Sequence, residues 1–156
     1  MAHIASIVYS PADDYRETAD YYLRVPVSQA ELVAGHGIRG DRKGSNPDRG
    51  LNVMSAELLA GLAREGFQTG PGQLGEQVVI AGLDFTSLAE GTRLQLGNNA
   101  TIEVIKNRTG CERFEHIQRH PPETAAGRLG FMASVVAGGP IAVGDAVTVL
   151  EVVAGD

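Results

Sequence analysis

The glycine content of this chain limits the folds open to it more than any other feature. Twenty of its 156 residues are glycine, and they are spread from Gly35 to Gly155. Glycine adopts left-handed backbone angles without strain and weakens the interior of helices. This distribution therefore favours tight turns between short strands over a helical bundle, and we expect a mainly β fold.

Apolar and β-branched runs between these glycines predict the strands. About eight short strands, with two or three short helices, are expected; such a set favours a closed or nearly closed β-barrel, because closure removes exposed strand edges. A doubly wound α/β sheet is not expected, since regular strand-helix alternation is missing. The predicted strands are residues 2–9, 26–33, 51–54, 76–80, 91–97, 100–105, 131–136, 141–143 and 146–152.

One helix is clearly marked, at residues 56–65. Ser55 is a good N-cap, Glu57 lies in the first turn, and Gly66 ends the helix. Its leucines lie at helical spacing and predict a stripe that faces the core. We therefore assign this helix to packing.

Size and composition indicate one globular domain. The chain has 43% hydrophobic and 21% charged residues, which is ordinary for such a domain. We expect residues 1–152 to form it and residues 153–156 to be a C-terminal tail. The first residues lack a signal-peptide pattern, and no apolar stretch approaches the length that spans a bilayer. A single cysteine excludes a disulfide framework within one chain. These features favour a cytoplasmic protein that binds no membrane.

The net charge of −6 argues against nucleic-acid binding. The positive charge is nevertheless concentrated. Residues 35–50 and 106–128 hold nine Lys and Arg but only five acids. Two such windows in an acidic protein favour a shared anionic ligand. The alternative is a set of unrelated surface arginines.

The first window is rich in glycine, at Gly35, Gly37, Gly40 and Gly44. Such a loop lets the backbone approach a ligand, and its N–H groups can form an anion-binding nest. Asp41 can orient Arg42 or Arg49, and either arginine can hold a phosphate through two hydrogen bonds. The motif is neither a Walker loop nor a dinucleotide fingerprint. An ordinary set of turns is the alternative.

The second window contains the only cysteine, Cys111. Thr109 and Glu112 have the spacing of a capping box, which would place Cys111 near the start of a short helix. Unpaired N–H groups and the helix dipole favour an anion there, and basic neighbours such as Arg108 and Arg113 favour it further. The pattern predicts a reactive thiolate, whereas the alternative is a small buried side chain.

Taken together, these motifs resemble the MOSC domain, which occurs at the C-terminus of molybdenum cofactor sulfurases and as stand-alone bacterial proteins. The resemblance covers roughly residues 1–152. It is carried, in order, by Gly37-Ile-Arg-Gly-Asp-Arg42, Arg49, Ser55-Ala-Glu-Leu-Leu59, Gly75-Glu76, Gly82-Leu-Asp84, Leu88-x-x-Gly91-Thr-x-Leu94, Arg108-Thr-Gly-Cys111, Gly127-Arg128-x-Gly130 and Gly138-Gly-x-Ile-x-Val-Gly-Asp145.

The resemblance implies a barrel of the pyruvate-kinase-barrel type and a site for the molybdenum cofactor, an anionic pterin. It also implies that Cys111 either carries sulfur as a persulfide or ligates molybdenum. The cofactor-binding residues that it implies are Gly40, Asp41, Arg42, Arg49, Arg108 and Arg128.

The chain lacks the pyridoxal-phosphate domain of full-length sulfurases, and neither Lys43 nor Lys106 has the context of a Schiff base. A sulfur carrier or sulfurtransferase would therefore need a separate donor, such as a cysteine desulfurase, and possible acceptors are molybdoenzymes. Two alternatives are a small molybdoenzyme that reduces N-hydroxylated compounds and a non-catalytic module that delivers cofactor. A zinc site at Cys111, His116 and His120 is disfavoured, because two prolines follow His120 and arginines flank the ligands.

Overall fold

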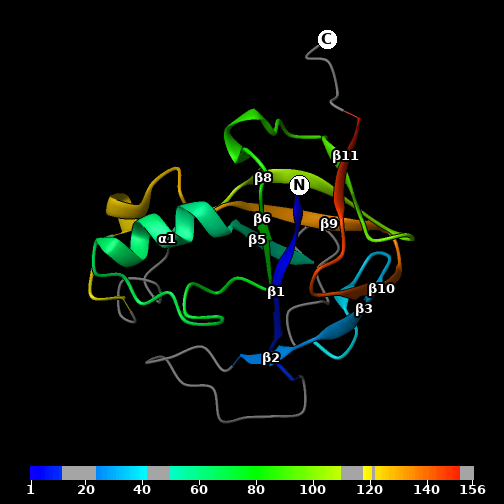
Figure 1. Cartoon of the computed structure of the whole chain (residues 1–156), viewed down its shortest axis with the longest axis horizontal. Helices are drawn as coiled ribbons and strands as arrows, with labels where there is room; N and C mark the ends of the chain where they lie inside the picture. Colours follow the sequence, from blue (N-terminus) through cyan, green and yellow to red (C-terminus); the bar gives the residue numbers. More distant parts are fainter. Residues whose placement is uncertain (12–23, 42–49, 110–117, 121, 152–156) are drawn as a thin grey trace.

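The structure, a computed structural model, describes residues 1–11, 24–41, 50–109, 118–120 and 122–151 (Figure 1). Strands dominate these residues, and the mainly β prediction is confirmed. The strands are β1 His3–Tyr9, β2 Val25–Val27, β3 Gln29–Val33, β4 Gly37–Ile38, β5 Leu51–Ser55, β6 Val78–Ala81, β7 Arg93–Leu96, β8 Ala100–Asn107, β9 Phe131–Ala137, β10 Gly139–Ala142 and β11 Val147–Glu151. The helical elements are α1, Ala56–Arg64, and two 3-10 turns, Phe85–Ser87 and Pro122–Ala125.

The strands form two sheets. The eight-stranded sheet has the order β11-β7-β8-β9-β5-β6-β1-β2, and the smaller sheet has the order β10-β3-β4. Among the described residues, β11 and β2 do not pair, so the larger sheet stays open and the predicted closed barrel is not confirmed. Hydrogen bonds do link the start of β1 to the segment before β11, as from Ile4 N to Asp145 O at 2.9 Å.

The main core lies between the two sheets. Along β8, Ala100, Ile102 and Val104 are buried while the residues between them are more exposed. This alternation is the side-chain period of a strand with one buried face. The smaller sheet contributes Leu32, Ile38 and Ile141 to the same cluster. The alternation of apolar residues at 100–105 is visible in the sequence and predicts the buried face of β8.

The predicted helix is confirmed as α1. The Ser55 hydroxyl oxygen accepts a hydrogen bond from Leu58 N at 3.2 Å, which caps the helix. The helix joins β5 to β6, and these two strands are parallel. One β-α-β unit is therefore present, although the regular alternation of a doubly wound fold is not. Leu62 of α1 anchors a second, smaller core with Met54, Phe67, Leu74, Ala125 and Leu129.

The predicted strand 26–33 was wrong as a single element. β2 pairs with β1 of the larger sheet, whereas β3 pairs with β10 of the smaller sheet. The chain crosses between the sheets at Ser28, whose carbonyl oxygen accepts a hydrogen bond from Val143 N at 2.9 Å. The predicted helix at Cys111 and the predicted tail 153–156 lie outside the described residues.

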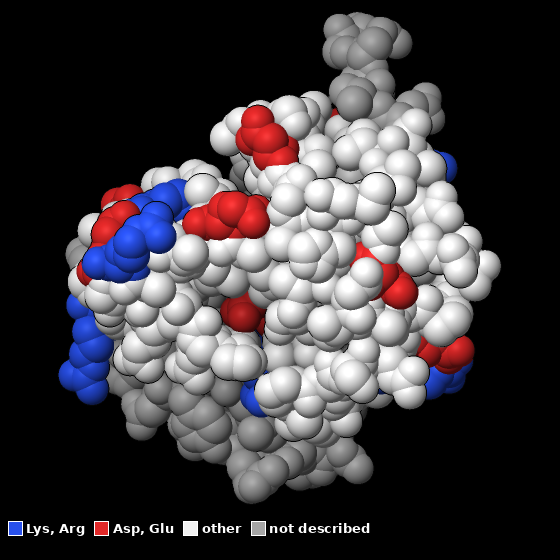
Figure 2. Space-filling view, in the orientation of Figure 1, with Lys and Arg blue, Asp and Glu red and all other residues white. Residues whose placement is uncertain are grey.

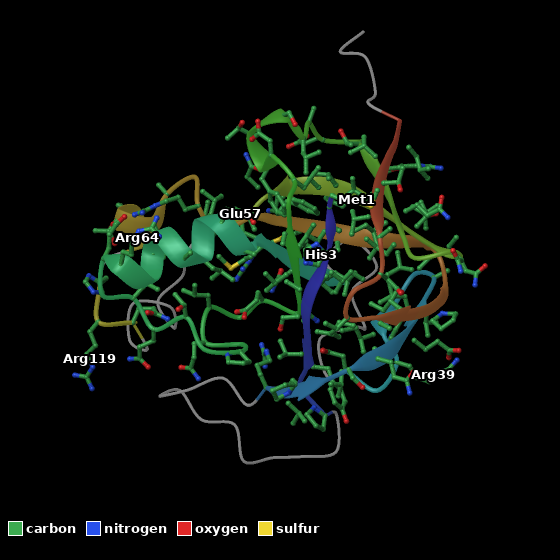
Figure 3. All side chains as sticks on the ribbon, in the orientation of Figure 1. Met1, His3, Arg39, Glu57, Arg64 and Arg119 are labelled. Atoms are coloured by element: carbon green, nitrogen blue, oxygen red, sulfur yellow. The ribbon has the colours of Figure 1, made fainter. Side chains whose placement is uncertain are left out.

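On the face drawn in Figure 2, basic side chains at the α1 end lie beside acidic ones, and further acidic side chains are scattered over the rest of this face. Arg39 and Arg119 point outward on opposite sides of the molecule (Figure 3). Within the described ranges, no helix has both the length and the apolar character needed to cross a membrane.

Candidate functional site

Buried polar side chains converge on residues 67–77, the connecting loop between α1 and β6. Within the described part of the chain, the buried polar side chains are Ser10, Arg24, Asp41, Ser55, Glu76, Gln77, Thr92 and Gln118. Most of them belong to the connecting loop or contact it. Burying a polar group costs free energy unless the group is hydrogen-bonded, so this concentration of buried polar side chains indicates a specific hydrogen-bond network.

Asp41 joins the first basic window to the end of the connecting loop. Its carboxylate oxygen Oδ2 accepts hydrogen bonds from Gln77 Nε2 at 3.1 Å and from Ser10 N at 3.2 Å. Gln77 Oε1 in turn accepts from Asn52 N at 2.6 Å, and Asn52 Nδ2 donates to Gly75 O at 3.1 Å. Asp41 is therefore fixed in a network that reaches into the larger sheet.

Two glycines, Gly37 and Gly50, allow the two ends of the glycine-rich window to lie close together. A Cβ at Gly50 would lie 2.7 Å from the His36 carbonyl oxygen, and a Cβ at Gly37 would lie 2.4 Å from the Gly50 carbonyl oxygen. Only glycine allows this approach of two backbones. Both glycines therefore serve chain packing, and for Gly37 this differs from the ligand contact that the sequence suggested.

Glu76 holds the connecting loop in shape. Its carboxylate oxygens accept hydrogen bonds from Gly72 N at 2.8 Å and Leu74 N at 3.1 Å. Burial raises the pKa of Glu76, although these bonds and the charge of Arg108 act in the opposite direction. The side chain of Arg24 packs against Gly72, where a Cβ would lie 2.2 Å from the Arg24 stem.

Arg108 fastens the start of the cysteine segment to the same loop. Its Nη2 donates to Leu74 O at 2.8 Å and its Nη1 to Leu129 O at 3.2 Å. The Arg108 backbone N–H donates to Gly130 O at 3.0 Å. Two guanidinium nitrogens of this arginine therefore hold backbone carbonyl groups.

Gln118, seven residues after Cys111, attaches the chain to the connecting loop a second time. Its Nε2 donates to Gln68 O at 2.8 Å and Gln73 O at 3.1 Å, and its Oε1 accepts from Gln68 N at 2.7 Å. The ring of His120 stacks on Phe67, with centroids 4.4 Å apart. His120 is thus placed against the loop, while Cys111 and His116, the other residues of the zinc alternative, lie outside the described residues.

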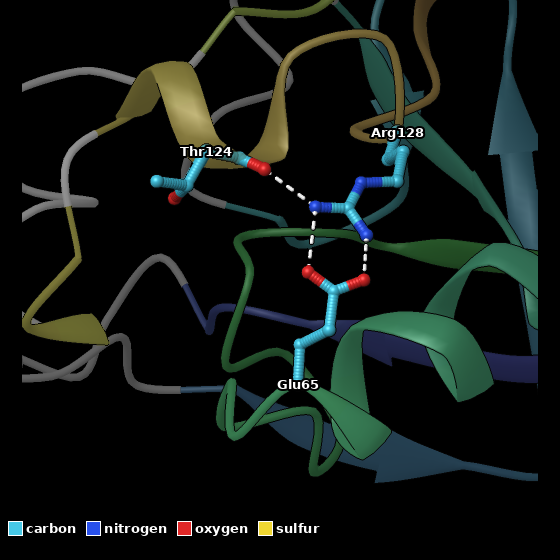
Figure 4. A network of polar contacts seen from close by, with 3 residues as sticks. All are labelled: Glu65, Thr124 and Arg128. Atoms are coloured by element: carbon cyan, nitrogen blue, oxygen red, sulfur yellow. Dashed lines mark hydrogen bonds and ion pairs between the residues drawn. The ribbon is translucent and has the colours of Figure 1, made fainter.

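Arg128, an expected anion binder, is paired with a carboxylate (Figure 4). Its guanidinium donates to both oxygens of Glu65, with one of these bonds at 3.1 Å, and also to Thr124 O. The hydrogen bond from Arg128 holds the pKa of Glu65 below its ordinary value. In this arrangement the charge of Arg128 is used to tie the 3-10 turn at residues 122–125 to the end of α1.

A pocket of about 440 Å³ lies beside Asp41, with Gly40 in its wall. Its size is within the usual range for small-molecule sites. Arg39 at its rim is paired with Glu31. The lining residues are Tyr9, Pro11, Val27, Gln29, Ala30, Ile38, Arg39 and Gly40.

A comparison with protein families matches residues 40–148 to the MOSC domain. This chain belongs to the MOSC domain family. MOSC domains are associated with molybdenum cofactor proteins, and the resemblance inferred from the sequence is confirmed. No curated protein matches the chain.

Solved structures share the fold of this MOSC domain. YiiM from Geobacillus stearothermophilus is 17% identical, with a TM-score of 0.75 over 97% of this chain and 76% of that protein. YiiM from Escherichia coli is 22% identical, with a TM-score of 0.70 over 97% of this chain and 70% of that protein. The YUAD protein from Bacillus subtilis is 20% identical, with a TM-score of 0.72 over 94% of each chain.

The MOSC site residues predicted from sequence are only partly described by the structure. Asp41 and Arg108 both reach the connecting loop, so the loop links the two basic windows. Arg128 lies apart on Glu65, and Cys111, Arg42 and Arg49 lie outside the described residues. Sequence reasoning missed Gln77, Asn52 and Gln118, because their partners are distant in the chain. The motif Gly75-Glu76 was the one local signal that pointed to the loop.

Proposed function

We propose that this protein binds the molybdenum cofactor and carries sulfur on Cys111 as a persulfide, as a sulfur carrier or sulfurtransferase. The observation that supports this proposal is the attachment of Asp41 and Arg108 to one loop. Because these residues belong to the two basic windows, an anionic ligand near the loop would lie close to both. Membership of the MOSC family gives the ligand class.

The described residues fit an organic cofactor at the Asp41 end. The pocket beside Gly40 is large enough for a small ligand, and its lining combines apolar side chains with the polar side chains of Gln29 and Arg39, which suits a polar ring system. Arg108 donates hydrogen bonds to backbone carbonyl groups, and Arg128 is paired with Glu65. We therefore assign the anionic groups of the cofactor to the other two arginines of the predicted site, Arg42 and Arg49. When bound, the cofactor would supply a molybdenum centre that can accept sulfur.

The sulfur step needs a separate donor with a persulfide, such as a cysteine desulfurase. The Cys111 thiolate would attack the terminal sulfur of that persulfide, forming a new S–S bond. The S–S bond of the donor would break, and its cysteine would leave as a thiolate, so the exchange involves no net oxidation. A reducing cytoplasmic compartment would keep Cys111 ready for this step, and a molybdoenzyme would be the acceptor.

Intact mass after incubation with a cysteine desulfurase and cysteine tests this proposal. We expect the wild type to gain one sulfur atom that a thiol reductant removes, and Cys111→Ser to gain none. An unmodified wild type, or equal uptake by Cys111→Ser, would contradict the sulfur-carrier role.

Metal analysis after co-expression with cofactor biosynthesis separates the alternatives. Stoichiometric molybdenum with thiolate ligation would favour a small molybdoenzyme that reduces N-hydroxylated compounds. Cofactor delivery that persists in Cys111→Ser would favour a non-catalytic delivery module. The sulfur-carrier proposal instead expects sulfur uptake that depends on Cys111 and no lasting thiolate bond to the metal.

A further inference from the structure

We infer that a second pocket, formed by the start of α1 and the residues that follow β6, binds a small organic amine in its ammonium form. This amine pocket has a volume of about 410 Å³, which is within the usual range for small-molecule sites. Among the described residues, it shares no lining residue with the pocket beside Gly40. The inference therefore goes beyond the proposed function and does not depend on it.

One wall of the amine pocket is apolar and held by the core. Leu58, Leu83 and Phe85 line the pocket, and all three are half-buried. Leu83 and Phe85 pack against the main core, and the Phe85 ring lies 5.2 Å from the Phe131 ring, measured between centroids. Because the core holds these side chains, the wall is formed before a ligand binds. An apolar group of a ligand would be removed from water against it.

Two carboxylates give the amine pocket a negative charge. Glu57 and Asp84 are exposed, so they lie where the pocket opens to solvent, and none of its described lining residues is basic. Among the described residues, neither carboxylate has an ion-pair partner, whereas Glu31, Glu65 and Glu103 are each paired with an arginine. A bound cation would therefore compensate charge that this part of the chain leaves unpaired.

Hydrogen bonds hold both carboxylates at the pocket. The two oxygens of Glu57, which lies at the start of α1 (Figure 3), accept from Gly82 N at 3.1 and 3.2 Å. Oδ1 of Asp84 accepts from Thr86 Oγ1 at 2.6 Å and from Thr86 N at 2.9 Å, and these bonds lower the pKa of Asp84. Asp84 is therefore ionised at neutral pH. A carboxylate offers about four acceptor positions, so each can also accept from an ammonium group.

An ammonium group attached to an apolar group matches both parts of the pocket. The ammonium can donate to Glu57 and Asp84, while a ring or short alkyl chain covers the apolar wall. A neutral analogue would lose the charge-assisted hydrogen bonds, and a carboxylate ligand would be repelled by both acids. We therefore expect the pocket to select amines over alcohols and acids of the same size.

An NMR titration of the isotope-labelled full chain with phenethylamine tests the inference. Phenethyl alcohol and phenylacetate are the neutral and anionic probes. We expect saturable shifts of the Gly82, Leu83 and Thr86 amides at low salt, with a dissociation constant of about 1 mM, as is usual for a ligand of this size. Phenethyl alcohol should bind about fivefold more weakly, and phenylacetate should leave these amides unshifted.

Glu57→Gln and Asp84→Asn each remove one charge and keep an oxygen that can accept the same backbone hydrogen bond. Each variant should weaken phenethylamine binding about two- to fivefold, which is the range of an exposed ion pair. Glu90→Gln is the matched control, because Glu90 is an exposed acid that does not line the pocket. It should leave the dissociation constant unchanged.

An absence of saturable shifts at the pocket amides would overturn the inference, as would equal binding of phenethylamine and phenethyl alcohol. An equal loss of affinity in Glu90→Gln would also overturn it, because that result would show a general effect of net charge. The titration uses no sulfur donor. Its outcome is therefore separate from that of sulfur uptake by Cys111, which tests the proposed function.

Discussion

Glu76 places an ionisable carboxyl group where only 1% of the residue is exposed. Its two oxygens accept N–H groups of Gly72 and Leu74, and these bonds add to the backbone hydrogen bonds of the loop's own turns. Desolvation nevertheless dominates, and burial raises the pKa of Glu76 above its ordinary value of 4.5. A raised pKa makes stability depend on pH.

The pH dependence follows from proton uptake. Between pH 4.5 and its raised pKa, Glu76 binds more protons in the folded state than in the unfolded state. The unfolding free energy of wild type should therefore fall, relative to Glu76→Gln, as pH rises through this window. Urea unfolding of both proteins at pH 4.5 and at about pH 7 measures the difference. A relative stability that rises with pH would show that the hydrogen bonds outweigh desolvation.

Asp41 is also a buried carboxylate, and among the described residues it accepts hydrogen bonds from two donors. In Asp41→Ala, Ser10 N and Gln77 Nε2 would lose this acceptor. We expect a loss of about 1–3 kcal/mol in unfolding free energy, because buried donors would be left without a partner. Glu90→Ala, at an exposed carboxylate, is the control and should stay within about 0.5 kcal/mol of wild type. Equal values for both variants in urea unfolding would contradict the buried role.

At the scale of elements, two glycines have opposite roles. Gly50 precedes β5 and lies against the His36 carbonyl oxygen, whereas Gly61 lies within α1, where a Cβ would meet only Arg64 Nη2 at 3.7 Å. We expect Gly50→Ala to lose about 1–3 kcal/mol through the backbone collision. Gly61→Ala should gain about 0.5–1 kcal/mol, because alanine favours the helix. Thermal unfolding of both variants checks the two signs.

Elements with local signals were predictable from sequence. Ser55 and Gly66 mark the ends of α1, and the alternation in β8 marks its buried face. The change of sheet at Ser28 has no local signal, because it depends on which distant strands pair. The same reason applies to the site. The contact of Gln118 with Gln68 spans 50 residues, so a reading of neighbouring residues finds Cys111 and its basic neighbours but misses what fastens that segment.

At the scale of the whole molecule, the connecting loop joins two cores. Phe67 and Leu74 pack in the smaller core, and Val78, at the start of β6, packs in the main one. The buried polar side chains lie along the loop between these anchors. Loss of packing in the smaller core should therefore weaken the hydrogen bonds of the connecting loop at the candidate site.

Leu62→Ala and Ile102→Ala compare the two cores. Both side chains are fully buried, and each truncation should cost about 2–5 kcal/mol in unfolding free energy. Only Leu62→Ala should also speed hydrogen exchange at Gly72 and Leu74, because Leu62 packs in the core that holds the loop. Equal exchange at these two amides in both variants would mean that the loop does not depend on the smaller core.

The connecting loop is gripped mainly through its peptide groups, at residues 68, 72, 73, 74 and 75. Peptide groups are the same whichever amino acid carries them, so substitutions of the outward side chains of this loop can leave these hydrogen bonds in place. Distant relatives would then keep the conformation of this loop while their amino-acid sequences diverge. A protein engineer can use the same freedom and vary Gln73 to build new surface chemistry beside the site.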